Sequence, residues 1–83
     1  MKVRVEVKLP RYGTTMEDAT VARWLKAPGD PAAKGEPLCE LETEKVTVEL
    51  ESPVNGTLIE IVAEAGTVAE VGTVLCCVET EVS

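Results

Sequence analysis

Residues 41–50 read LETEKVTVEL, and this stretch decides the fold. From Val46 to Leu50, apolar and polar residues alternate, which is the period-two pattern of a β-strand with one wet face. A second strand-like run meets this one at Glu44-Lys45, with no Gly, Pro, Asn or Asp between them. A turn of such residues avoids positive φ and is expected to be type I-like. We therefore predict a β-hairpin with Lys45 at its tip and the Lys45 side chain in water.

Strand-length runs separated by turn residues continue along the rest of the chain. Residues 2–9 alternate Val and Leu with charged residues, and residues 57–62 and 73–78 are apolar runs of strand length. Gly, Pro and Asp gather between the runs, as in Pro28-Gly29-Asp30-Pro31, where they favour turns. We therefore predict an all-β fold of about eight short strands in a closed or nearly closed antiparallel sandwich.

An internal repeat relates the two halves of the chain. With a shift of 37 residues, positions 19–44 and 56–81 are identical at 9 of 26 places. Gly29 falls on Gly66, and because matching glycines imply matching turns, we expect positive φ at both. Chance similarity between strands rich in Gly, Thr and Val is the alternative. The repeat predicts a single core covered by two similar halves that are related by a pseudo-twofold axis.

Composition excludes several classes of function. The chain of 83 residues suffices for one small domain, and its net charge of -7 is unsuited to binding nucleic acid or an anionic membrane surface. Because the chain has no His, it lacks Ser-His-Asp and Cys-His nucleophile pairs and His-metal sites. No apolar run approaches the ~20 residues of a membrane span. We expect no catalytic residue and no metal site.

The cysteines, the tryptophan and most glycines fit structural roles. The three cysteines include no C-x-x-C, which indicates reduced thiols rather than a disulfide framework or a zinc knuckle. Cys39 and Cys76 fall on each other in the repeat and are interpreted as core thiols, with reactive thiols as the alternative. Trp24 is expected to anchor the core or its edge. Turns are also the expected place of Gly13, Gly35, Gly56, Gly66 and Gly72.

The residues around Lys45 carry a resemblance to a known family. An exposed hairpin lysine is ordinarily a solubilising residue. Here Glu42-Thr43-Glu44-Lys45-Val46 resembles the E-T-D-K-[AV] lipoylation motif, with Glu44 in place of the commoner Asp. The family is the lipoyl domain of the dihydrolipoamide acyltransferase (E2) component of 2-oxo acid dehydrogenase complexes.

The resemblance spans nearly the whole chain, from about Val5 to Val78. Residues 9–17 are similar to the first loop of the family, P-x-x-G-x-T-M-E, and residues 21–38 and 51–58 are similar to its later strands. Tyr12 stands where this loop often has Leu, Met or Ser, and Ala19 where many members have Gly. These departures bear on which dehydrogenase partner is recognised.

The resemblance implies a flattened barrel-sandwich hybrid of two antiparallel, about four-stranded sheets with pseudo-twofold symmetry. Residues 1–83 would form a single lipoyl carrier domain, non-catalytic by itself, with lipoic acid in amide linkage on Lys45. The implied recognition residues that flank this lysine are Glu42, Glu44 and Val46. The implied partner-recognition loop comprises Tyr12, Gly13, Thr14, Thr15 and Met16.

The resemblance also implies the partners. They are a lipoate ligase or lipoyl transferase, the thiamin-diphosphate decarboxylase (E1), the E2 acyltransferase core and the flavin dihydrolipoamide dehydrogenase (E3). The arm on Lys45 would shuttle acyl groups and reducing equivalents between these enzymes, and acidic surface would favour docking onto their basic patches. We expect a domain that is monomeric alone, in the bacterial cytoplasm or the mitochondrial matrix. The first loop fits pyruvate, branched-chain and acetoin-type complexes.

Three alternatives stand beside this interpretation. A biotinyl carrier domain of a biotin-dependent carboxylase presents a similar lysine, typically with Met on both sides, whereas Glu44 and Val46 flank Lys45. The glycine-cleavage H protein carries lipoate on a longer chain with added helices. An interaction module could retain the fold without modification. We also expect Lys8, 37 residues before Lys45 and not preceded by Glu-Thr-Glu, to remain unmodified.

Overall fold

The computed structural model describes residues 1–12 and 16–82, and every regular element within these ranges is a β-strand. The eight strands are β1 (Lys2–Lys8), β2 (Asp18–Trp24), β3 (Pro31–Ala32), β4 (Pro37–Glu42), β5 (Thr47–Glu51), β6 (Gly56–Ile61), β7 (Val68–Glu70) and β8 (Val74–Glu81). The all-β prediction is confirmed. No helix in the described part of the chain is long and apolar enough to cross a membrane.

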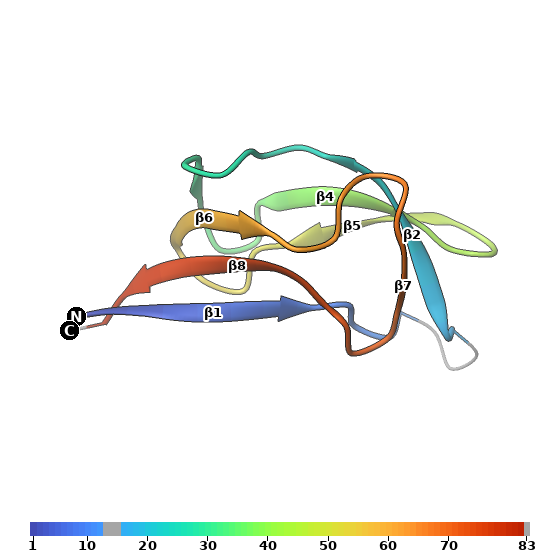
Figure 1. Ribbon diagram of the computed structural model, residues 1–83, viewed down its shortest axis with the longest axis horizontal. Helices are drawn as coiled ribbons and strands as arrows, with labels where there is room; N and C mark the ends of the chain where they lie inside the picture. The colour runs from blue at the N-terminus through green and yellow to red at the C-terminus, as the bar shows by residue number, and fades with distance from the viewer. Residues whose placement is uncertain (13–15, 83) are drawn as a thin grey trace.

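The strands form two four-stranded antiparallel sheets. One sheet has the order β1-β8-β6-β3 and the other has the order β5-β4-β2-β7. The molecule measures 39 × 22 × 18 Å, and β1, β4 and β8 run along its longest axis, whereas β2 is steeply inclined to it (Figure 1). The predicted arrangement of two antiparallel sheets is confirmed.

The 37-residue repeat is present in the strand pairing. Val21 of β2 pairs with Leu41 of β4, and 37 residues later Leu58 of β6 pairs with Val78 of β8. A bulge follows at the same place in both strand pairs. Since register and irregularity both repeat, the similarity of the halves is structural and not chance, and the predicted pseudo-twofold relation is confirmed.

The edge strands β1 and β5 also correspond to each other, but with a different shift. Val7 of β1 pairs with Cys76, just as Leu50 of β5 pairs with Cys39. Residues 7 and 50 differ by 43, so the 37-residue shift found between the other strands does not extend to this pair. With this correspondence, the strand order of one sheet maps onto that of the other.

Gly29 and Gly66 hold matching turns between the halves. Their φ angles are 100° and 92°, which confirms the expected left-handed conformation. The N–H of Gly29 donates to the carbonyl oxygen of Leu58, and the N–H of Gly66 donates to that of Val21, each at 2.7 Å. Each turn is thus hydrogen-bonded to a strand of the opposite half.

Gly56 is a strand residue, and its interpretation as a turn glycine is wrong. It is the first residue of β6, and a Cβ placed on it would lie 2.1 Å from the carbonyl oxygen of Glu79 on β8. Glycine is therefore required here by the close approach of two strands. Gly35 and Gly72 lie in turns, as expected, and both have positive φ, whereas Gly13 lies outside the described residues.

The core lies between the sheets and includes two of the thiols. Cys39 and Cys76 have no exposed surface, and burial raises the pKa of both thiols to about 12. Their interpretation as core thiols is confirmed, since a group so hard to ionise is a poor nucleophile. Trp24 packs against the core and donates its indole N–H to the carbonyl oxygen of Ala63 at 2.8 Å, as expected of an anchor at the core edge.

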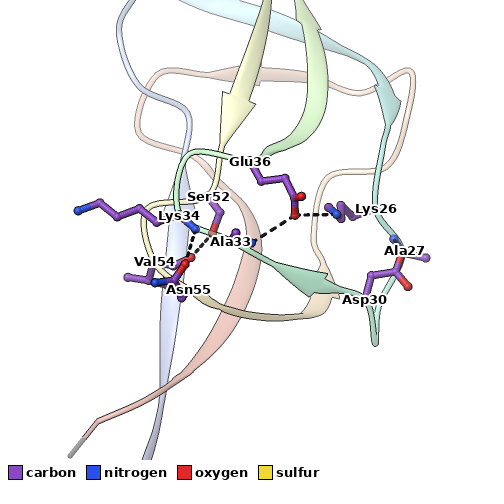
Figure 2. Close-up of polar contacts among 9 residues, drawn as sticks. All are labelled: Lys26, Ala27, Asp30, Ala33, Lys34, Glu36, Ser52, Val54 and Asn55. Atoms are coloured by element: carbon purple, nitrogen blue, oxygen red, sulfur yellow. Dashed lines mark hydrogen bonds and ion pairs between the residues drawn. The ribbon is translucent and has the colours of Figure 1, made fainter.

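Polar contacts fasten the turns around β3 (Figure 2). The Lys26 Nζ lies 2.7 Å from Glu36 Oε1, and the Lys34 N–H donates to Asn55 Oδ1 at 2.8 Å. The hydrogen bond from Lys26, with a second from a backbone N–H, lowers the pKa of the Glu36 carboxyl. Ser52 is buried and exchanges backbone hydrogen bonds with the β3–β4 turn. These contacts link β2, β3, β4 and the β5–β6 turn.

Candidate functional site

Lys45 lies at the tip of the β4–β5 hairpin with its side chain exposed. β4 ends at Glu42 and β5 begins at Thr47, and a bend at Glu44 and Lys45 reverses the chain between them. In the described part of the chain only glycines have positive φ, which excludes the type I′ and II′ turns common in tight hairpins. The structure confirms the expected lysine at an exposed hairpin tip without positive φ.

Three hydrogen bonds between Thr43 and Val46 close the hairpin below its tip. The backbone N–H of Thr43 donates to the carbonyl oxygen of Val46 at 2.9 Å. The hydroxyl of Thr43 donates to the same oxygen at 2.7 Å and accepts from the N–H of Val46 at 3.2 Å. From the sequence, Thr43 was identified only as part of the motif Glu42-Thr43-Glu44-Lys45-Val46, and the hydrogen bonds of its hydroxyl were not predicted. A threonine at the corner of a glycine-free turn is the signal that could have found them.

The Lys45 amine is free to react with an external group. Among the residues that the structure describes, its Nζ takes part in no hydrogen bond or ion pair. The flanking residues Glu42, Glu44 and Val46 are all exposed, and Val46 as a whole residue is 58% exposed. Any enzyme that approaches the lysine therefore meets two carboxylates and one apolar side chain beside it.

The hairpin lies at one end of the long axis, and both chain termini lie at the other end (Figure 1). The pseudo-twofold relation explains this placement. Thr43 faces Val46 below the tip, and at the equivalent place Thr80 pairs with Val3 beside the termini. β4 and β5 are thus joined by the hairpin that contains Lys45, whereas the equivalent strands of the other half, β8 and β1, end at the chain termini and are not joined there.

This correspondence assigns Lys45 a structural counterpart. With the 43-residue shift between β1 and β5, Lys45 falls on Lys2, and Lys8 falls on Glu51. Lys2 sits within a paired strand, and its Nζ lies 3.7 Å from a carboxylate oxygen of Glu79. Lys8 is therefore not the equivalent of Lys45 in the fold, although 37 residues separate them, and neither Lys2 nor Lys8 lies on a closed tip.

The first loop is tied to β5, the strand that leaves the hairpin. The Tyr12 hydroxyl donates to the carbonyl oxygen of Glu49 at 3.3 Å, and β5 is an edge strand of its sheet. The backbone N–H of Tyr12 contacts the Met16 sulfur at 3.3 Å, and Met16 packs against the core. Burial raises the pKa of the Tyr12 phenol, and the nearby Cys39 and Glu51 raise it further.

The residues expected in the first loop therefore differ in placement. Tyr12 is 43% exposed and can meet a partner, whereas Met16 serves as an anchor. Gly13, Thr14 and Thr15 lie outside the described residues. The contact between Tyr12 and Glu49 was not foreseen, because nothing in the local sequence links residues 37 apart.

Comparison with known proteins identifies the family. The family described as "Biotin-requiring enzyme", the biotin/lipoyl family, matches residues 5–78, from within β1 to within β8. The chain belongs to this family.

Curated relatives place the chain with E2 components. It is 49% identical over 74 residues to the dihydrolipoyllysine-residue succinyltransferase component of the 2-oxoglutarate dehydrogenase complex of Bartonella vinsonii, covering 89% of this chain and 18% of that one. It is 38% identical over 76 residues to the lipoamide acyltransferase component of the branched-chain alpha-keto acid dehydrogenase complex of Bacillus subtilis, covering 92% and 18%. The chain thus spans less than a fifth of the length of these relatives.

A solved structure agrees. The lipoyl domain of the 2-oxoglutarate dehydrogenase complex from Azotobacter vinelandii superposes with a TM-score of 0.72 and 32% identity, covering 93% of this chain and 96% of that one. Together with the relatives, this similarity identifies a lipoyl domain of the E2 type and favours it over the biotinyl carrier alternative.

Proposed function

We propose that residues 1–83 form one carrier domain in which Lys45 bears lipoic acid in amide linkage and moves acyl groups and electrons between the enzymes of a 2-oxo acid dehydrogenase complex. The observation that carries the proposal is the Lys45 amine, exposed and without a partner among the described residues at the tip of a closed hairpin. An amine in this state can enter the active site of a ligase. The bond formed is an amide between the lipoate carboxyl and Nζ.

The residues present fit the cofactor. When bound, lipoic acid supplies a dithiolane that takes up an acyl group with two electrons and passes them on. The chain has no His, and its Cys39 and Cys76 thiols are buried with a pKa of about 12, so these groups do not compete for the acyl group. This supports a non-catalytic role for the domain itself.

What the protein contributes is presentation and tethering. The hairpin projects from the end of the molecule that lies opposite the termini, so a chain attached at either terminus leaves Lys45 unobstructed (Figure 1). Tethering keeps the effective concentration of the arm high at each active site within its reach. A sandwich with locked turns holds the base of the arm still while the arm itself moves.

Partner recognition is proposed for the surface around the hairpin. Tyr12 lies against β5 beside it and is proposed to meet the dehydrogenase partner, E1, whereas Glu42, Glu44 and Val46 surround the lysine itself. The acidic side chains favour enzymes with basic surface at the entrance to the active site, with the larger effect on the association rate. The partners proposed are a lipoate ligase or lipoyl transferase, E1, the E2 core and E3, with the domain monomeric by itself.

The test is reductive acylation of the lipoylated domain. The domain is incubated with E1 enzymes specific for pyruvate, 2-oxoglutarate or branched-chain 2-oxo acids, each with its substrate, and intact mass is measured. We expect the mass of one acyl group to be gained with at least one E1, faster than on free lipoamide, and never on Lys45→Arg carried through the same lipoylation step. Failure of every E1 to acylate the lipoylated domain faster than free lipoamide would contradict the proposal.

A further inference from the structure

We propose that Thr43 is a positioning residue for the modification of Lys45, because its hydroxyl holds the two-residue tip in the shape that the ligase meets. This inference rests on the proposed function, since it concerns the attachment step at Lys45. It goes beyond that function by naming a residue that does not touch the reacting amine.

The need for such a residue follows from the turn. Two-residue hairpin tips normally use turns with positive φ, because their twist matches the right-handed twist of the strands. The tip here, Glu44 and Lys45, has no glycine and no positive φ. A turn of the unprimed kind tends to splay the strands that it joins. Something other than the backbone must therefore hold Thr43 and Val46 together.

The Thr43 hydroxyl supplies this link. Between Thr43 and Val46 the backbone contributes one hydrogen bond, from the Thr43 N–H to the Val46 oxygen at 2.9 Å. The hydroxyl adds two more, at 2.7 Å to the same oxygen and at 3.2 Å from the Val46 N–H. Two of the three bonds that close the tip thus depend on one side-chain oxygen.

The Thr43 hydroxyl affects Lys45 by limiting the conformations of the hairpin tip before the ligase binds. Glu44 and Lys45 lie beyond the last paired residues of β4 and β5, and among the described residues their side chains make no hydrogen bond or ion pair. The Thr43–Val46 closure is therefore what restrains the tip. Without the hydroxyl the tip samples more conformations, and the ligase must pay the ordering cost when the domain docks.

The pseudo-twofold fold provides an internal control. Thr80 is the equivalent of Thr43 in the second half, and its hydroxyl donates to the carbonyl oxygen of Asn55 at the far end of the molecule. Removing this hydroxyl deletes a hydrogen bond of the same chemical type, at the equivalent repeat position, far from Lys45. Any general effect on folding is shared by the two variants, whereas an effect on presentation of the lysine is not.

The experiment measures lipoylation rates of four folded domains: wild type, Thr43→Val, Thr43→Ser and Thr80→Val. Valine keeps the β-branched shape and removes the hydroxyl, and serine keeps the hydroxyl. Each domain is given a lipoate ligase with lipoate and ATP, and the attachment rate is followed by intact mass over a range of domain concentrations. Amide hydrogen exchange of Val46 and thermal melts are recorded for each.

We expect Thr43→Val to lower kcat/KM by about two- to tenfold, mainly through KM, because the loss of a hydrogen bond is of this size. Exchange of the Val46 amide should quicken in the same variant. Thr43→Ser should restore both, and Thr80→Val should alter neither, whatever it does to the melting temperature. Equal rates for Thr43→Val and wild type, or an equal slowing in Thr80→Val, would overturn the inference. No attachment to the wild type would instead contradict the proposed function.

Discussion

At the scale of single residues, Gly29 and Gly56 require glycine for different reasons. Gly29 has positive φ with open space where a Cβ would be, so Gly29→Ala should cost only the left-handed strain, about 1–2 kcal/mol. At Gly56 a Cβ would meet the Glu79 carbonyl oxygen at 2.1 Å, so Gly56→Ala should cost about 3 kcal/mol through overpacking between β6 and β8. Chemical denaturation measures the free energy of unfolding of both variants, and a larger loss of stability in Gly29→Ala than in Gly56→Ala would contradict this account.

The two glycines also show what sequence can predict at this scale. The repeat placed Gly29 on Gly66, and matching glycines at the same turn can be recognised by comparing the halves. The requirement at Gly56 arises from a strand that approaches it from another part of the chain, 23 residues beyond it in the case of Glu79. Such a contact leaves no local pattern, which is why Gly56 was misinterpreted as a turn residue.

At the scale of elements, the contact between the first loop and β5 is open to a direct test. Tyr12→Phe removes the hydroxyl that donates to Glu49 and keeps the ring. Because the hydrogen bond is long and partly exposed, we expect a loss of stability below about 1 kcal/mol. The rate of reductive acylation of the lipoylated domain by E1 should fall about two- to fivefold, because the freed aromatic side chain at position 12 must be ordered again on docking.

Lipoylation of Tyr12→Phe by the ligase serves as the control and should proceed at the wild-type rate, since the Thr43–Val46 closure is intact. An unchanged rate with E1 would show that the tie between Tyr12 and β5 has no part in recognition.

The hairpin and the loop differ in how far they could be predicted. Strand-like runs on both sides of Glu44-Lys45 were enough to predict the β4–β5 hairpin and its exposed lysine, because strand patterning is local. The loop contact joins residues 37 apart and required the fold. The correspondence of β1 with β5 was missed for another reason. At the 43-residue shift, residues 2–8 and 45–51 are identical at four of seven positions, but this shift differs from the 37 residues that relate the other strands.

At the scale of the whole molecule, the two core thiols should make the folded state less stable as pH rises in the alkaline range. Cys39 and Cys76 have a pKa raised from 9.0 to about 12 by burial in the folded state. Below pH 9 the two thiols are protonated in both the folded and the unfolded state, so they do not change the free energy of unfolding with pH. As pH rises from 9 towards 12, only the unfolded state ionises, so each thiol should lower the free energy of unfolding by about 1.4 kcal/mol per pH unit.

The measurement is the free energy of unfolding from pH 8 to pH 11 for the wild type and for the double variant Cys39→Ala with Cys76→Ala. The variant starts from a lower value because of the cavities that it creates, but its slope against pH should be shallower. Parallel slopes for the two proteins would contradict the assignment of both thiols to a dry core.

The central claim is tested most directly by locating the modification among the five lysines of the folded domain, Lys2, Lys8, Lys26, Lys34 and Lys45. The folded domain is treated with ligase, lipoate and ATP and then cleaved by a protease, and the masses of the peptides are measured by mass spectrometry. We expect one lipoyl increment, confined to the fragment with Lys45, and none in Lys45→Arg. An increment on Lys2, the structural counterpart of Lys45, on any other lysine, or on none would contradict the account.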